Sequence, residues 1–165
     1  MSCLIKQKAQ YIKSLILDVD GVLTDGTILL TEDGQELKRF HTQDGLGIHA
    51  LQQCGIVVAI ISSRKSKAVD RRAKELGINH FFQGRASKIE VFQELLTQLQ
   101  LPLSVIAYMG DDLSDLPIMK KVGLSIAPAN AVALVKQQAH WTTQARGGCG
   151  AVREVCDFII ETQAS

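Results

Sequence analysis

Strand-length apolar runs alternate with segments of helical period along the whole chain, and this alternation most constrains the fold. The runs are rich in Val, Ile and Leu and lie at residues 15–19, 56–61, 81–82, 105–109 and 124–126. Continuous rather than alternating apolar runs are typical of parallel strands buried on both faces. Apolar stripes with helical spacing occupy residues 69–76, 88–99 and 152–159. The pattern predicts an α/β fold, a three-layer αβα, Rossmann-like parallel sheet.

One segment departs from this alternation. Residues 27–40 place Asp33-Gly34 between two strand-like arms, which predicts a small β-hairpin inserted after the first strand. The chain has 165 residues, about the length of one domain. We therefore expect a single domain over residues 1–165.

The composition limits the kinds of binding partner and the compartment that we expect for this protein. The net charge is +1 and aromatic residues make up 5% of the chain, so nothing favours a nucleic-acid partner. No apolar run approaches the roughly 20 residues of a membrane span. Lys6, Lys8 and Lys13 interrupt any signal-like apolar stretch near the start. The four cysteines lack metal-ligand spacing, and we expect buried free thiols in a cytoplasmic protein.

Acidic residues follow two of the predicted strands. Asp18 and Asp20 end the first strand, and Asp111, Asp112 and Asp115 follow the fourth. Carboxylates brought together repel one another, and an oxygen-only ligand set without Cys or His favours Mg²⁺. Two structural alternatives stay open at this point. One is an Asp-Gly turn with solvated carboxylates, and the other is a set of helix caps.

Two further residues at strand or helix ends could bind a phosphate. Ser62 closes the second predicted strand, and Lys88 opens the helix that begins with SKIEVF. A hydroxyl can donate to anionic oxygens, and a lysine neutralises charge. Taken singly, Ser62 is equally a helix cap and Lys88 a solvated side chain.

Four features thus follow one another along the chain: an acid pair, a serine, a lysine and a second acidic cluster. In this order they resemble the motifs of the haloacid dehalogenase superfamily of phosphohydrolases. The resemblance implies that Asp18 is the nucleophile, forming an aspartyl-phosphate, and that Asp20 is the general acid and base. It also implies catalytic roles for Ser62 and Lys88, Mg²⁺ bound by Asp18, Asp20 and Asp111, and a supporting shell of Asp112 and Asp115.

Superfamily members usually carry a cap domain, but the gaps between these motifs are too short for one. A site without a cap needs a macromolecular substrate or a neighbouring subunit to close it. The whole chain resembles the capless, tetrameric 3-deoxy-D-manno-octulosonate 8-phosphate phosphatases. The likeness lies in DGVLTDG, ELKRFHTQDGLGI, GDDLSDLPIM and GGCGAVREVCD. It implies a homotetramer assembled through the hairpins and a mobile tail at residues 146–150 that can fold over an active site.

The same resemblance implies a set of contacts to the sugar acid. These fall on His41, Thr42, Gln43, Asp44, Gly45, His49, Arg64 and Arg72, with Lys88 on the phosphate. An anionic sugar phosphate needs such cations. From spacing alone, Arg72 is equally an edge residue whose stem packs on apolar neighbours, and Arg64 a surface charge.

The function implied is magnesium-dependent hydrolysis of 3-deoxy-D-manno-octulosonate 8-phosphate in lipopolysaccharide precursor synthesis. Three alternatives stay open. A related branch acts on nine-carbon keto-sugar acid phosphates of sialic-acid-type pathways. Some superfamily domains are catalytically silent regulatory or structural modules. A phosphomutase would need a cap to exclude water, which the short chain disfavours.

Overall fold

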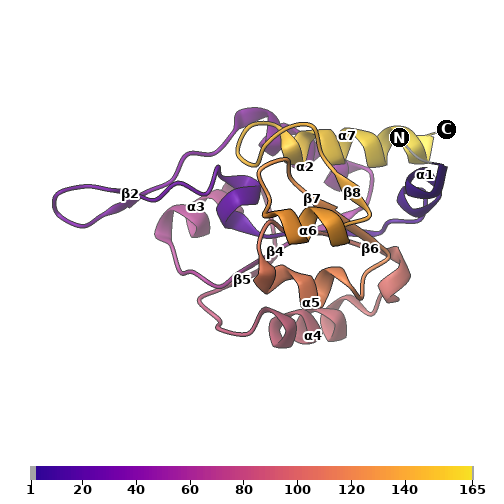
Figure 1. Ribbon diagram of the computed structural model, residues 1–165, viewed down its shortest axis with the longest axis horizontal. Helices are drawn as coiled ribbons and strands as arrows, with labels where there is room; N and C mark the ends of the chain where they lie inside the picture. The colour runs from indigo at the N-terminus through magenta and orange to yellow at the C-terminus, as the bar shows by residue number, and fades with distance from the viewer. Residues whose placement is uncertain (1–2, 165) are drawn as a thin grey trace.

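A six-stranded parallel sheet forms the centre of the computed structural model, which describes residues 3–164 (Figure 1). The strands lie in the order β5-β4-β1-β6-β7-β8. Their bounds are β1 Ser14–Leu17, β4 Val57–Ser62, β5 His80–Gln83, β6 Ile106–Met109, β7 Leu124–Ala127 and β8 Trp141–Thr142. Leu17 at the end of β1 lies opposite Ile60 of β4 and Met109 of β6. Three neighbouring strands thus end at one edge, where ligand sites of such sheets form.

Helices cover both faces of the sheet. One layer contains α1 (Cys3–Ala9), α2 (Thr42–Gln53), α3 (Lys67–Glu75) and α7 (Ala151–Ala164). The other contains α4 (Lys88–Leu99), α5 (Leu116–Met119) and α6 (Ala133–Gln138). Alternate side chains of β1 enter opposite layers, Leu15 and Leu17 the first and Ile16 the second. The predicted αβα architecture is confirmed, and residues 3–164 contain no cap domain.

A two-stranded ribbon projects from this body at the far end from the chain termini (Figure 1). It consists of β2 (Leu29–Leu30) and β3 (Glu36–Leu37), paired antiparallel. Gly34 in the connecting turn has a φ of 79°, which a glycine adopts without strain. The ribbon is the hairpin that the sequence predicts, and the leucines of both its strands are exposed.

Two expectations differ from the structure. The short strand β8 was not predicted; it adds Trp141 and Thr142 to the edge of the sheet beside β7. The expectation of buried cysteines is wrong for three of the four, since only Cys156 is buried and Cys3, Cys54 and Cys149 are exposed. Cys54 follows the last turn of α2 and points away from the core, although the apolar spacing suggested otherwise. Within residues 3–164, no helix has the length and apolarity to span a bilayer.

Candidate active site

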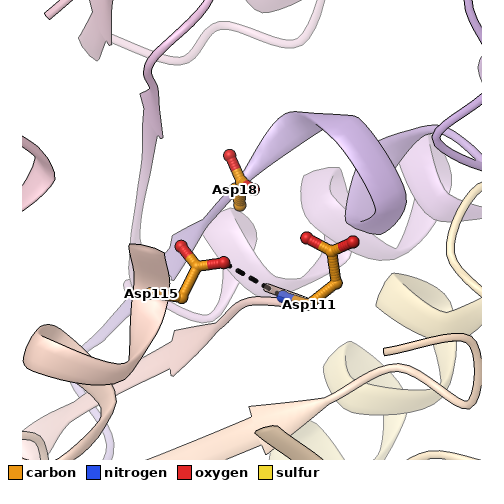
Figure 2. Close-up of side chains that lie close together, drawn as sticks. All are labelled: Asp18, Asp111 and Asp115. Atoms are coloured by element: carbon orange, nitrogen blue, oxygen red, sulfur yellow. Dashed lines mark hydrogen bonds between the residues drawn. The ribbon is translucent and has the colours of Figure 1, made fainter. Parts of the chain in front are cut away.

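Three aspartates from two strand ends meet at the carboxyl edge of the sheet. Asp18 follows β1, while Asp111 and Asp115 follow β6, and one carboxylate oxygen of each lies within 4.8 Å of those of the others. Figure 2 shows the three side chains together, with Asp115 turned toward the backbone nitrogen of Asp111. The register that ends β1 and β6 side by side produces this meeting. The two acidic segments therefore form one site, as predicted.

Asp115 is fully buried, and its carboxylate is occupied by donors of the protein. One oxygen accepts from Lys88 Nζ at 2.8 Å and from the Tyr108 hydroxyl at 2.6 Å. The other accepts from the backbone N–H groups of Asp111 at 3.1 Å and Asp112 at 3.2 Å. Four donors leave this carboxylate little capacity to bind a ligand. Asp115 thus contacts the residues around it, whereas Asp18 has an ion pair with Lys88 at one of its oxygens.

Asp112 has a different role from Asp115. Its side chain is exposed and accepts from the backbone N–H of Leu113 at 2.7 Å, capping the turn at Leu113–Asp115. Asp115 completes the capping box with Asp112. The helix-cap alternative therefore holds for Asp115, which also contacts Lys88, and the structure adds Asp112 as the N-cap.

Lys88 is the buried cation of the cluster. Its Nζ lies 2.8 Å from an oxygen of Asp18 and 2.8 Å from an oxygen of Asp115. Burial lowers the pKa of this ammonium, but the attraction of the two carboxylates outweighs it, so the pKa of Lys88 is raised. The residue is 6% exposed, which excludes the solvated-lysine alternative.

One lysine does not balance three carboxylates. The pKa of Asp18 is raised to about 6, mainly by burial and also by Asp115, while Lys88 lowers it. The pKa of Asp111 is raised to about 7, mainly by burial and also by Asp18 and Asp115. The raised pKa values of both carboxyl groups show that their ionised forms are disfavoured, as expected for buried anions without enough counter-charge. The site therefore favours binding of a cation.

A cavity of about 300 Å³ opens onto this cluster. Four predicted catalytic residues, Asp18, Asp20, Ser62 and Lys88, line it together with Asp111 and Arg64. Ser62 ends β4 at the same edge of the sheet and is buried, and its hydroxyl donates to the Arg64 carbonyl at 3.3 Å. Side chains from all four sequence motifs thus line one cavity.

Asp20 lies at the rim of the cavity, inside the turn η1 (Val19–Leu23). Its two carboxylate oxygens have different partners. Lys38 Nζ contacts Oδ1, and Arg64 Nε lies 3.9 Å from Oδ2. Lys38 follows β3, so the base of the hairpin reaches the catalytic edge. Sequence reasoning missed Lys38, because a lysine in a hairpin arm carries no signal of tertiary contact.

Comparisons with known proteins agree with this geometry. Residues 79–153 match the haloacid dehalogenase-like hydrolase family. A 3-deoxy-D-manno-octulosonate 8-phosphate phosphatase, KdsC, from Yersinia pestis is 48% identical over 157 residues, covering 95% of this chain and 84% of that protein. The chain belongs to this phosphatase family. It is therefore a phosphomonoester hydrolase.

Solved structures of the family superpose closely on the chain. A Yersinia pestis 3-deoxy-D-manno-octulosonate 8-phosphate phosphatase matches with a TM-score of 0.98 and 46% identity, covering 99% of this chain and 89% of that one. A Moraxella catarrhalis phosphatase of the same name matches with a TM-score of 0.94 and 46% identity, covering 97% and 92%. That crystal structure is a complex with a magnesium ion, a phosphate ion and a KDO molecule. The fold of the family extends over nearly the whole chain.

Most of the sugar-contact residues expected of this phosphatase lie outside the cavity of the single chain. Arg64 lines it, whereas the others lie on α2 and α3 or just before α2. These others are His41, Thr42, Gln43, Asp44, Gly45, His49 and Arg72. Thr42, Gln43 and His49 are exposed.

Asp44 and Arg72 have structural partners. Asp44 is buried and accepts from the backbone N–H groups of Gly150 and Arg153, joining α2 to the start of α7. Arg72 lies over the Phe40 ring at 5.9 Å and pairs with Glu75 at 3.5 Å. The Arg72 side chain thus packs on the Phe40 ring, and its charge is paired with Glu75. This arrangement agrees with the edge-residue alternative. A sugar-binding role for these two stays a prediction.

The segment at residues 146–150, which the resemblance implies is a mobile tail, packs on its own chain in this structure. Gly148 N–H donates to the Val22 carbonyl at 2.9 Å, and Gly147 N–H donates to the Asn130 side chain at 2.6 Å. The same Asn130 side chain donates to the Gly21 carbonyl at 2.9 Å. The segment therefore supports the turn that carries Asp20. Sequence reasoning also missed Asn130, which lies in a loop far from the motifs.

Gly147→Ala is expected to destabilise this phosphatase and to impair catalysis. A Cβ there would lie 1.8 Å from the Gly21 carbonyl oxygen, and backbone cannot move as a side-chain end can. We expect a loss of about 2–4 kcal/mol in unfolding free energy. Turnover should fall as well, because Gly21 adjoins Asp20. Urea unfolding and phosphate release measure the two effects.

Gly77→Ala is the matched control. Its φ is 65°, but no atom lies within 4 Å of the added Cβ. It should cost about 1 kcal/mol through backbone strain alone and leave turnover intact. Wild-type stability and turnover in Gly147→Ala would contradict the packing described here.

Proposed function

We propose that the chain hydrolyses 3-deoxy-D-manno-octulosonate 8-phosphate to the free sugar acid and inorganic phosphate, in lipopolysaccharide precursor synthesis. The observation that carries the proposal is the pairing of Asp18 with Lys88 at 2.8 Å, beside Asp111, in a cavity open to solvent. The substrate follows from the family, whose Moraxella catarrhalis member was crystallised with phosphate and KDO. One domain spanning residues 1–165 is proposed to do this.

The residues of the site fit a magnesium ion. The available oxygens are carboxylates without Cys or His, and the raised pKa values of Asp18 and Asp111 mark negative charge that Lys88 leaves unbalanced. The Asp18 and Asp111 carboxylates and the Asp20 carbonyl would hold the ion. When bound, Mg²⁺ neutralises charge on the phosphoryl oxygens and on the nucleophile.

The side chains of the chain perform the proton and phosphoryl transfers. An oxygen of Asp18 attacks phosphorus in line with the leaving sugar oxygen, forming an aspartyl-phosphate. Asp20 donates a proton to that leaving oxygen, then takes one from the water that releases phosphate. Lys88 and the Ser62 hydroxyl bind phosphoryl oxygens, and Lys88 also orients Asp18.

Assembly is proposed to complete the sugar site. The cavity is lined by the catalytic groups and Arg64, but His41, Thr42, Gln43, Asp44, Gly45, His49 and Arg72 are not among its lining residues. The exposed hairpin residues Ile28, Leu29, Leu30 and Leu37 form an apolar surface suited to contact between subunits. We propose a homotetramer in which neighbouring hairpins bring further polar groups to each site. Three exposed free cysteines fit a reducing compartment such as the cytoplasm.

The test is phosphate release from a panel of sugar phosphates with magnesium. The panel contains the eight-carbon keto-acid phosphate, a nine-carbon keto-acid phosphate and simple hexose phosphates. The proposal predicts the highest kcat/KM for the eight-carbon acid. Preference for the nine-carbon acid would keep the chemistry and overturn the substrate, and absence of turnover would favour a catalytically silent module.

Magnesium is expected to stabilise the protein more at high pH than at low pH. In the metal-free fold the pKa values of Asp18 and Asp111 are about 6 and about 7, both above the ordinary 3.8. These groups favour the fold at low pH, and that contribution is lost as pH rises through their folded pKa values. A cation must displace their protons at low pH but finds free carboxylates above about pH 7.

The measurement is the rise in Tm on replacing EDTA with magnesium, taken between about pH 5 and pH 8. The rise should be small at the acid end and largest above pH 7. A rise independent of pH would contradict the assignment of Asp18 and Asp111 as ligands.

A further inference from the structure

Lys38 is a buried lysine that none of the four motifs contains. Its side chain is 2% exposed, and it contacts Oδ1 of Asp20 and lies 3.3 Å from Oε1 of Glu36. Lysine is rarely buried to this degree unless it is paired, because its charge must leave water. The two carboxylates supply the pairing, and one of them is the proposed acid and base of the reaction.

We propose that Lys38 is a positioning residue for the phosphatase reaction, holding one carboxylate oxygen of Asp20 so that the other faces the cavity. The inference rests on the proposed function. A charge-assisted hydrogen bond to a buried, immobile donor fixes a carboxylate more firmly than an exposed partner does. The other ion pair of Asp20 within residues 3–164 is with Arg64, at 3.9 Å and half-exposed.

Glu36 connects this arrangement to the hairpin. It contacts Lys38 through one oxygen and Arg64 Nη2 through the other. Asp20, Lys38, Glu36 and Arg64 thus form a ring that joins the base of the ribbon, the turn after β1 and the loop after β4. The base of the ribbon is therefore linked to the Asp20 carboxylate through Lys38.

The dependence on the leaving group separates this role from general support of the fold. Protonation of the leaving oxygen matters for an alkyl phosphate, whose alkoxide leaves poorly, and much less for p-nitrophenyl phosphate. A positioned acid typically contributes about 10²–10⁴-fold. Lys38→Met should therefore lower kcat/KM at least roughly 10-fold for a sugar phosphate and less than about 3-fold for the aryl phosphate.

The experiment measures kcat/KM for both substrates in the full-length protein with magnesium, alongside Tm. Arg39→Met is the matched control, since Arg39 is adjacent and its exposed side chain pairs with Asp25; neither substrate should be affected. In an Asp20→Asn background, Lys38→Met should add nothing further to the loss with the sugar phosphate. Lys38→Arg, which keeps the charge, should recover part of the selectivity.

Equal losses with both substrates, or no loss, would overturn the proposal. Should Lys38→Met fail to fold, Glu36→Gln tests the same ring: it should give a smaller loss confined to the sugar phosphate, and an unselective loss counts against the role. Any alkyl phosphate that the wild type hydrolyses serves here. A wrong assignment of the eight-carbon substrate thus leaves this comparison intact, whereas a wild type inactive on every phosphate overturns both proposals.

Discussion

Asp18→Asn is expected to abolish turnover while leaving the fold intact. The amide cannot attack phosphorus, and removal of a catalytic nucleophile, as measured in a serine protease, lowers kcat by far more than about 10⁴-fold. The fold should survive because the substitution is isosteric and removes a buried charge. Burial already raises the pKa of this carboxyl to about 6, so its ionised form is unfavourable without a bound cation. Phosphate release and thermal unfolding measure the two expectations.

Asp70→Asn provides the control for this substitution. Asp70 lies on α3, and its carboxylate pairs with exposed Lys74 at 2.8 Å. The same chemical change there should leave turnover at the wild-type level. Substantial turnover by Asp18→Asn, above that of a mock purification, would contradict the nucleophile assignment.

Lys88→Met is expected to reduce both stability and turnover. It leaves the Asp18 and Asp115 carboxylates buried without the ammonium that contacts both. Removing one partner of a buried ion pair costs about 3–5 kcal/mol. Loss of a preorganised donor to the phosphoryl group costs about 10²–10³-fold in kcat. Methionine keeps the length of the stem, so the missing charge is the main change.

Denaturant unfolding in EDTA and steady-state phosphate release measure these effects. Magnesium should restore part of the stability, since it supplies positive charge to Asp18, but not the turnover. Lys74→Met is the surface control and should change stability by less than about 1 kcal/mol. A Lys88→Met protein of wild-type stability in EDTA would contradict the central role of this ion pair.

The sequence was sufficient to predict the features that depend on local pattern and on strand order. The predicted helix at Lys88–Leu99 has the same bounds in the structure. The convergence of Asp18, Ser62 and Asp111 followed from placing apolar runs side by side in one parallel sheet, because each residue lies at or just after a strand end. Tyr108 was not singled out from the sequence, although a polar partner for its hydroxyl could have been expected, because a tyrosine in a buried strand needs one.

Features that depend on contacts distant in the chain were not predictable in this way. Lys38 reaches Asp20 because the hairpin folds back over the edge of the sheet, and no periodicity encodes that path. Asn130 supports the turn around Gly21 from a loop 109 residues away. Cys54 has apolar neighbours in sequence, yet it follows the end of α2, where the helix no longer faces the core.

The expected sugar contacts show a second limit. The family resemblance implies sugar contacts at Asp44 and Arg72, but in the structure these side chains are engaged by α7 and by Phe40 and Glu75. The cavity of the single chain is lined by the proposed catalytic groups and, among the expected sugar contacts, by Arg64 and Lys88. In the proposed assembly, neighbouring subunits complete the recognition of the sugar, and a pattern of residues in one chain does not place such contacts.

Covalent phosphorylation of Asp18 tests the account most directly. Asp20→Asn should slow release of phosphate from the aspartyl-phosphate, so that acid quenching after mixing with p-nitrophenyl phosphate and magnesium traps it. Mass spectrometry of the digested protein should find one added phosphoryl group on the peptide containing Asp18. A burst of nitrophenolate with the phosphoryl group on Ser62, or with no modified peptide at all, would contradict the central claim that Asp18 attacks phosphorus.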